Sequence, residues 1–161
     1  MTMKEAVIAF WMKGFDFSGR ARRSEVWLNI LANVIIGFLI GMLSLVIDAV
    51  TGWRLHIAEH FSFFMETIFP SVVLIPGMAQ ASRRLHDINL DGRIAIVITV
   101  ASALIDFAVK HKSFFPLNFE KSGVMIIFSV ILGIGGFCLF IVNFIKGHTG
   151  ANQYGPDPKV I

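Results

Sequence analysis

The sequence predicts an all-α polytopic membrane protein, a bundle of four transmembrane helices preceded by an N-terminal interfacial amphipathic helix. The first observation is composition: the chain is 55% hydrophobic and 16% charged, whereas soluble domains are about 45–50% apolar and about 25% charged. The second is distribution, because the apolar residues gather in four blocks. Four spans with short links leave no room for a separate soluble domain, so residues 1–161 are predicted to be one membrane domain.

Residues 1–17 are predicted to form the interfacial helix. Apolar side chains that include Phe10 and Trp11 recur there at helical spacing, and Lys4 and Lys13 can meet anionic lipid. A loosely ordered tail is the alternative. The charges in this segment interrupt any apolar core of a signal peptide, so no cleavable signal peptide is expected.

The four apolar blocks are the predicted spans. A helix rises ~1.5 Å per residue and needs ~20 residues to cross the hydrocarbon layer. The third block is short, so burial against neighbouring helices or local thinning of the bilayer would have to help it. The predicted spans are residues 25–47, 61–81, 94–109 and 124–145, followed by a tail at 146–161.

Small residues and prolines predict how these helices pack. Gly37 and Gly41 form a GxxxG pattern in the first span, which allows close helix approach within one chain or between chains. Ser129, Gly133 and Gly136 offer a second small-residue surface in the last span. In the second span Pro70 and Pro76 remove backbone donors and are expected to bend the helix.

Lysine and arginine counts predict the orientation. The N-terminus, the second loop and the tail share one side of a four-span protein and carry ten of these residues, against four on the other side. The positive-inside rule therefore places both termini in the cytoplasm.

The outer side holds acidic and histidine residues. Asp48, Glu66 and Asp106 fall near the outer ends of their spans, where a carboxylate is expected to reach water. His56 and His60 are spaced i, i+4, which is half of a metal site, but this spacing alone is a weak signal. No metal and no cofactor is predicted.

Three polar segments, residues 17–25, 82–93 and 147–158, fall on the same predicted side. Their charged and polar side chains could pair and lock the helix ends together, because buried charges persist only when paired. Alternatively, the arginines could bind an anionic lipid head group or another phosphate. The candidate site residues are Arg20, Arg23, Glu25, Arg83, Arg84, His86, Asp87, Asn152 and Tyr154.

Catalysis by this set is not predicted. His86 and Asp87 are adjacent and would not face each other on a helix, and no nucleophile is paired with them. Ser82 lies four positions before His86, but a serine near a helix end is more often a cap or a backbone partner. Nucleic acid is not an expected partner either, because no base-stacking platform accompanies the arginines.

Three motifs resemble a bacterial inner-membrane family known as domain of unknown function 805. They are Gly-Arg-x-x-Arg-x-Glu-x-Trp at 19–27, Arg-Arg-Leu-His-Asp at 83–87 and Gly-x-x-Gly-x-Asn-x-Tyr-Gly-x-Asp-Pro at 147–158. The resemblance covers residues 15–158 and implies four helices in the inner membrane but no activity. After His-Asp the family commonly has Gly-x-Ser-Gly-Trp, where this chain has Asn-Leu-Asp-Gly-Arg at 89–93, and Val26 replaces an aromatic residue.

The predicted function is a non-enzymatic membrane module whose Arg/His-rich cytoplasmic face binds anionic lipid or a partner protein. A small transporter or channel is the alternative, and it would need a homo-oligomer because four helices are few for transport. A membrane-embedded enzyme is the third possibility. The sequence does not identify a ligand, an oligomeric state or a pathway.

Overall fold

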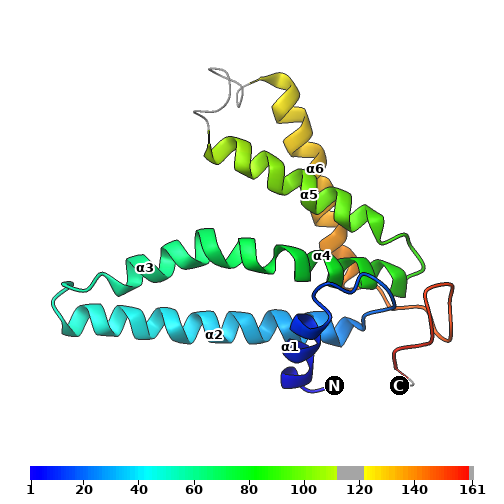
Figure 1. The fold of residues 1–161 in the computed structure, drawn as a ribbon, viewed down its shortest axis with the longest axis horizontal. Coiled ribbons are helices and arrows are strands. Elements are labelled where there is room, and N and C mark those ends of the chain that lie inside the picture. Colours follow the sequence, from blue (N-terminus) through cyan, green and yellow to red (C-terminus); the bar gives the residue numbers. More distant parts are fainter. Residues whose placement is uncertain (112–121, 160–161) are drawn as a thin grey trace. The chain divides into compact units, whose positions relative to one another are not determined.

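A computed structural model of the chain describes residues 1–111 and 122–159, and within these ranges it contains helices and no strand. Figure 1 shows their order along the chain. They are α1 (Met3–Met12), α2 (Arg23–Val50), α3 (Ile57–Phe63), the π-helical segment η1 (Phe64–Ile68), α4 (Phe69–Asp87), α5 (Arg93–Lys110) and α6 (Gly123–Val142). Each predicted span therefore coincides with a helix, although the helix bounds differ by a few residues.

Three stretches of the described chain are long and apolar enough to cross a membrane: α2, the continuous helix Ile57–Asp87, and α6. The all-helical membrane class is thereby confirmed. Helix α5 is not among the three, since it carries Arg93, Asp106 and Lys110 within its eighteen residues.

The chain divides into two compact units. The first contains Met1–Asp16 and Ser24–Gly77, and the second contains Phe17–Arg23 and Met78–Ile161. Helix α4 begins in the first unit and ends in the second.

In the first unit, α1 begins with a capping box. The Glu5 amide donates to the Thr2 hydroxyl at 3.2 Å, and the Thr2 amide donates to the Glu5 carboxylate at 2.8 Å. This satisfies two amides that have no partner within the helix. The helix ends at Met12, before the predicted limit at residue 17, with Phe10 buried and Trp11 exposed.

The two glycines of the GxxxG pattern lie against the second predicted span. A Cβ added at Gly41 would lie 3.1 Å from the Phe61 ring, and one at Gly37 would lie 3.7 Å from the methyl group of Met65. Helix α2 therefore packs within its own chain through the small face that the sequence predicts.

The predicted distortion in the second span is also present. The π-helical segment η1 ends two residues before Pro70, whose ring would collide with the carbonyl four residues earlier in a regular α-helix. In Figure 1 the path from α3 through η1 into α4 is visibly curved.

Asp48 does not reach water as predicted, because it is fully buried at the end of α2. Its two carboxylate oxygens accept hydrogen bonds from the Ile57 and Ala58 amides at 2.9 and 2.7 Å. The carboxylate thus caps the first turn of α3, where amides have no partner within the helix.

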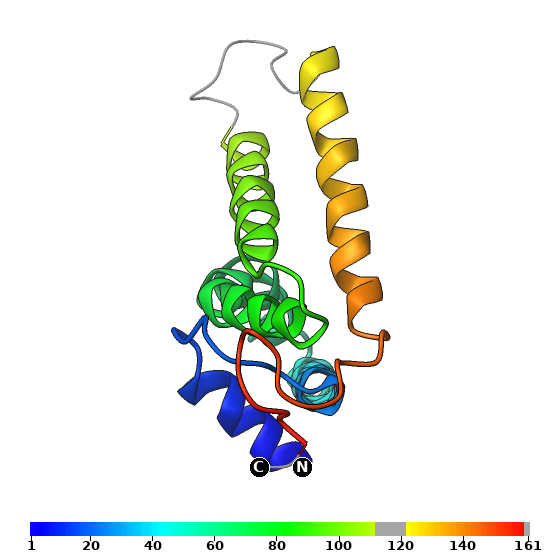
Figure 2. The ribbon, with the colours of Figure 1, turned by 90° about the vertical axis from the view of Figure 1, so that its right-hand side faces the viewer.

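In the second unit α5 and α6 lie side by side (Figure 2). The close approach is at Gly135, where an added Cβ would lie 3.1 Å from Ile98. The predicted small surface of Gly133 and Gly136 is a different one, with nothing within 4 Å of an added Cβ. Leu85, Ala95 and Val142, which lie near the end of α4, the start of α5 and the end of α6, form a small buried cluster.

Candidate functional site

The carboxylate of Asp87 links two buried arginines of the second unit. One oxygen accepts from Nε and Nη2 of Arg20 at 3.1 and 2.9 Å, and the other accepts from Nη1 of Arg84. The side chains of Arg20 and Arg84 are each 1% exposed and that of Asp87 is 4% exposed. Burying a charge costs free energy unless the charge is paired and hydrogen-bonded. Here one carboxylate pairs with two guanidinium groups, so each of the three buried charges has a partner of opposite sign. We call Arg20, Arg84 and Asp87 the polar cluster.

Arg20 uses its remaining donors on the tail. Its Nη2 donates to the carbonyl of His148 at 2.5 Å, and its Nη1 donates to the carbonyl of Gly150 at 2.6 Å. A planar guanidinium with five donors can serve a carboxylate and several carbonyls at once, which an ammonium cannot. Arg20 therefore ties the tail to the end of α4.

Arg84 likewise ties the end of α6 to α4. Its Nη2 donates to the carbonyls of Val142, at 3.2 Å, and Ile145. The last carbonyls of a helix have no partner within it and carry partial negative charge, so a cation is favourable there. Arg84 therefore caps α6 from the side of α4.

Backbone contacts complete the assembly. The Ala21 amide donates to the Arg83 carbonyl at 3.0 Å, and the His148 amide donates to the Asp87 carbonyl at 2.7 Å. At Gly147 an added Cβ would overlap the Asp87 carboxylate, so only glycine fits where the tail passes it.

His86 sits between the segment before α2 and the tail. Its Nδ1 lies 3.0 Å from the Gly19 carbonyl, so Nδ1 carries the proton and donates. The ring stacks on Tyr154 with centroids 3.8 Å apart and planes within 9°. The Asn152 side chain donates to the His86 carbonyl at 2.8 Å, which holds the tail turn in place.

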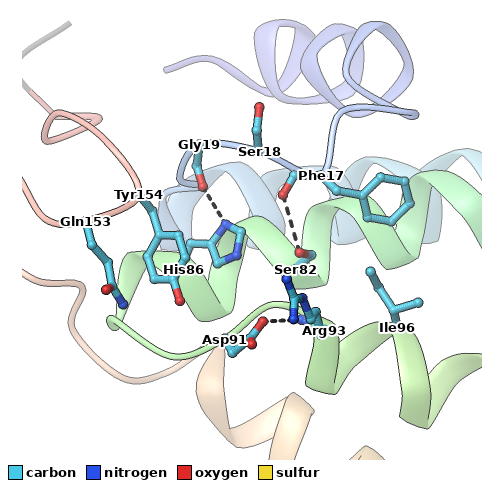
Figure 3. A pocket seen from close by; sticks show the side chains of 10 residues that line it. All are labelled: Phe17, Ser18, Gly19, Ser82, His86, Asp91, Arg93, Ile96, Gln153 and Tyr154. Carbon is cyan, nitrogen blue, oxygen red and sulfur yellow. Dashed lines mark hydrogen bonds between the residues drawn. The ribbon is translucent and has the colours of Figure 1, made fainter.

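A pocket of about 710 Å³ opens beside His86 (Figure 3). The Nδ1 edge of the imidazole points to Gly19, and the opposite edge points toward the region of Ser82 and Asp91. Apolar and polar side chains from four separate segments of the second unit surround this space. The lining residues are Phe17, Ser18, Gly19, Ser82, His86, Asp91, Arg93, Ile96, Gln153 and Tyr154.

Six of the nine predicted site residues meet in this assembly: Arg20, Arg84, His86, Asp87, Asn152 and Tyr154. Arg23 is exposed and donates to the Phe144 carbonyl at 3.2 Å. Arg83 is buried and contributes its carbonyl to Ala21. Glu25 is buried in the first unit, so it is not part of the described cluster.

The sequence does not indicate the pocket itself. Asp91 and Arg93 stood in the polar segment 82–93 and among the departures from a family pattern, and nothing local connects them with Phe17 or Tyr154. Gly147 stood at the start of the motif 147–158, but its close approach to Asp87 depends on where the tail passes the end of α4.

The arrangement has two chemical capacities. In the polar cluster both guanidinium groups are paired with Asp87, and of its buried side-chain donors only Arg84 Nε has no partner among the residues that the structure describes. The cluster therefore acts as a structural clamp, which favours pairing over anion binding for Arg20 and Arg84. The pocket instead offers side chains with unused hydrogen-bonding capacity, among them those of Asp91 and Arg93. Among residues 1–111 and 122–159, no group of three or more His, Cys, Asp or Glu side chains could hold a metal ion.

The C-terminal part of the tail carries a carboxyl group with a shifted pKa. Hydrogen bonds from the amides of Lys159 and Gly150, at 2.9 and 3.0 Å, lower the pKa of Asp157 from its ordinary value of 3.8. Favourable bonding to the charged form is the cause, and the nearby Arg20 charge adds to it.

Comparison with known proteins agrees with the membrane class. A family model described as "Protein of unknown function (DUF805)" matches residues 14–156. The inner membrane protein YhaH of Escherichia coli K12 is 31% identical over 144 residues, covering 89% of this chain and 88% of the relative. Inner membrane protein YhaI of the same strain is 28% identical over 143 residues, covering 89% and 86%. No solved structure matches the chain.

Proposed function

The chain belongs to the DUF805 family, and we propose that it is a non-enzymatic inner-membrane module that binds the phosphate of a lipid head group at its polar, cytoplasmic end. The proposal includes four spans, both termini in the cytoplasm, and an interfacial α1. The contacts of the second unit support the threading, and the pocket beside His86 supports the binding.

The polar cluster supports an even number of spans. Arg20 precedes α2, and the Gly150 carbonyl that it binds at 2.6 Å follows α6. Two groups in hydrogen-bond contact lie on the same side of a membrane, so the chain between them crosses an even number of times. The three most apolar helical stretches would give an odd number, and α5 as a fourth span makes the number even.

Helix α5 has the dimensions of a short span. Eighteen residues at ~1.5 Å per residue extend about 27 Å, close to the ~30 Å of hydrocarbon. Arg93 and Lys110 stand at its two ends, where long basic side chains can reach the head groups. Packing on α6 at Gly135 supplies the neighbour that a short span needs.

Helix α1 has the residues expected of an interfacial helix. Trp11 and Met12 are exposed, and Lys4 is also exposed near the helix start. An apolar surface flanked by lysine favours the boundary of an anionic membrane. The excess of basic residues on the side of the polar cluster favours a cytoplasmic location, although Lys112 and Lys121, counted on the outer side, lie outside the described residues.

Cysteine accessibility tests this threading. In a Cys138→Ser background, we expect a membrane-impermeant thiol reagent to label Thr51→Cys in intact spheroplasts. Ser18→Cys and Thr149→Cys should react only after the membrane is opened. Labelling of either from outside would contradict the cytoplasmic assignment, and labelling of only one of the two would contradict four spans.

The observation that carries the binding proposal is the unpaired guanidinium of Arg93 in the pocket. Within the described part of the chain, Arg93 forms no ion pair and only its backbone amide is hydrogen-bonded. Arg20 and Arg84, in contrast, are hydrogen-bonded to Asp87 and to backbone carbonyls. A guanidinium at the boundary of the membrane is a favourable partner for lipid phosphate.

Lipid binding to the purified, delipidated full chain tests the proposal. Native mass spectrometry with phospholipids of identical acyl chains gives an apparent Kd for each lipid. Because a hydrogen bond to a charged group contributes about 1.5–3 kcal/mol, Arg93→Gln should weaken every phospholipid about tenfold or more. Arg54→Gln, an equally exposed arginine in the first unit, is the control and should have no effect. Equal loss, or no loss, in both variants would refute Arg93 as the phosphate contact.

A further inference from the structure

We infer that the pocket selects a zwitterionic head group with a hydrogen-bonding ammonium, which is phosphoethanolamine. This inference rests on the proposed function, because it assigns a second contact to the lipid whose phosphate meets Arg93. It follows from three features of the pocket: opposite charges that do not pair, a directed acceptor on His86, and a glycine packed against that acceptor.

The pocket contains a carboxylate and a guanidinium that do not neutralise each other. Asp91 and Arg93 both line it, yet their side chains form no ion pair. One oxygen of Asp91 accepts from the Arg93 amide at 2.9 Å, and among the described residues the other oxygen has no partner. A ligand that carries one negative and one positive group would satisfy both side chains together.

His86 adds an acceptor to the same space. Its Nδ1 donates to the Gly19 carbonyl, so in the neutral ring Nε2 has a lone pair and no hydrogen. The residue is 9% exposed and is fixed by stacking on Tyr154, while Nε2 has no partner within the described ranges. This edge of the ring faces the pocket, and an ammonium N–H is a donor of the kind that the acceptor requires.

Gly92 packs directly against the edge of the imidazole that carries Nε2. Its φ of −64° is one that any residue adopts, so backbone freedom does not require glycine here. An added Cβ would lie 2.7 Å from His86 Nε2 and closer still to the Ser82 hydroxyl. A side chain at this position would therefore collide with Ser82 and cover the acceptor.

These features disfavour two other common head groups. A trimethylammonium group has positive charge but no N–H, so it cannot donate to His86 or Asp91. A glycerol head group can donate from its hydroxyls, but it adds no positive charge to balance Asp91. The remaining wall formed by Phe17 and Ile96 is apolar and suits the acyl side of a phospholipid.

The acidic and basic members of the pocket depart from the common family pattern. In the family pattern quoted above, serine and tryptophan stand where this chain has Asp91 and Arg93. The two departures introduce one negative and one positive charge into the same pocket. The inferred selectivity is therefore a property of this chain and does not extend to relatives that lack the pair.

The test compares three lipids with identical acyl chains and phosphodiester groups. In the native mass spectrometry titration, the full chain should bind phosphatidylethanolamine about tenfold more tightly than phosphatidylcholine, with phosphatidylglycerol between them. Asp91→Asn should reduce phosphatidylethanolamine to the level of phosphatidylcholine and leave phosphatidylcholine unchanged. The asparagine can still accept from the Arg93 amide, so the loop is preserved.

A second variant probes the acceptor. Gly92→Ala should also abolish the preference, because its methyl group fills the space before Nε2. Thermal midpoints identify variants that fail to fold, and Glu59→Gln, an exposed carboxylate change in the first unit, is the matched control for Asp91→Asn.

The possible outcomes separate the two proposals. If the three lipids bind equally and Arg93→Gln weakens all of them, phosphate binding stands and the ethanolamine inference is overturned. If Asp91→Asn leaves the preference intact, the inference is likewise overturned. If no phospholipid binds the unaltered chain, the proposed function itself fails.

Discussion

Replacing Asp87 with asparagine should destabilise the protein more than any other single carboxylate change in the described residues. The substitution keeps the size of the side chain and removes its charge. Arg20 and Arg84, each with a side chain 1% exposed, would then keep their positive charges without the carboxylate that lies between them. The neutral amide also has an N–H group where an oxygen accepted from an arginine.

The magnitude follows from the burial of the pair. Removing one partner of a buried ion pair costs about 3–5 kcal/mol, because it leaves an uncompensated buried charge. That range shifts the folding equilibrium by roughly two to four orders of magnitude, since each 1.4 kcal/mol is tenfold. Here one carboxylate serves two arginines, so a value near the upper end is expected.

Denaturant unfolding of the full chain in a mild detergent, followed by circular dichroism, measures this difference. Glu59→Gln is the control, because its side chain is 80% exposed, and its free energy of unfolding should change by less than about 0.5 kcal/mol. A double-mutant cycle with Arg20→Met should recover part of the loss, since it removes one of the orphaned charges. A loss below about 1 kcal/mol for Asp87→Asn would refute the view that the polar cluster is a clamp.

Three further predictions concern glycines and the tail. Gly147→Ala should cost about 1–3 kcal/mol in unfolding free energy, because its methyl group overlaps the carboxylate of the polar cluster. The lowered pKa of Asp157 means that its contribution to the folded tail is complete above its ordinary value of 3.8 and is lost as the pH falls through the folded-state pKa. Limited proteolysis with an acid-active protease should therefore show faster cleavage within the tail on acidification, and Asp157→Asn should abolish that pH dependence. Gly41→Leu should lower the thermal midpoint, because Phe61 already lies 3.1 Å from an added Cβ.

Matched variants make these predictions specific. Gly136→Ala and Gly133→Leu add side chains where nothing lies within 4 Å of a Cβ, so neither should change stability appreciably. Equal effects at Gly147 and Gly136, or at Gly41 and Gly133, would show that any substitution of glycine disturbs these helices. Asp106→Asn, an exposed carboxylate on α5, should leave the acid sensitivity of the tail intact.

The sequence predicted the helices because the physics of each is local. An apolar block of membrane length leaves few alternatives to a helix. A proline within such a block predicts a local distortion of the helix, as Pro70 does beside η1. The grouping of Arg20, Arg84 and Asp87 was also within reach, because threading brings their segments to one predicted side. The sequence could not predict which arginines are buried and paired, because that depends on where the carbonyls of α6 and the tail lie.

Asp48 shows a limit of a different kind. Its position near the end of a span indicated contact with water, but its carboxylate caps α3 instead. That outcome depends on how the chain turns after α2, and the left-handed backbone of Trp53 and His56 in this turn gives no strong signal in the sequence. The pocket was hidden for a similar reason, because its walls come from four segments that no local pattern connects.

The distance in sequence between the partners of Arg20 also governs the order in which the protein can be completed. Asp87 follows Arg20 by 67 positions and Gly150 follows it by 130. At a synthesis rate of about 5–20 residues per second, roughly 7 to 27 s separate the appearance of Arg20 from that of its last acceptor, the Gly155 carbonyl, which lies 135 positions later. During that interval the Arg20 guanidinium must form its hydrogen bonds with water or with lipid phosphate. The nascent chain therefore carries a temporary positive charge at its membrane entry, and the arrival of the tail removes it from the surface.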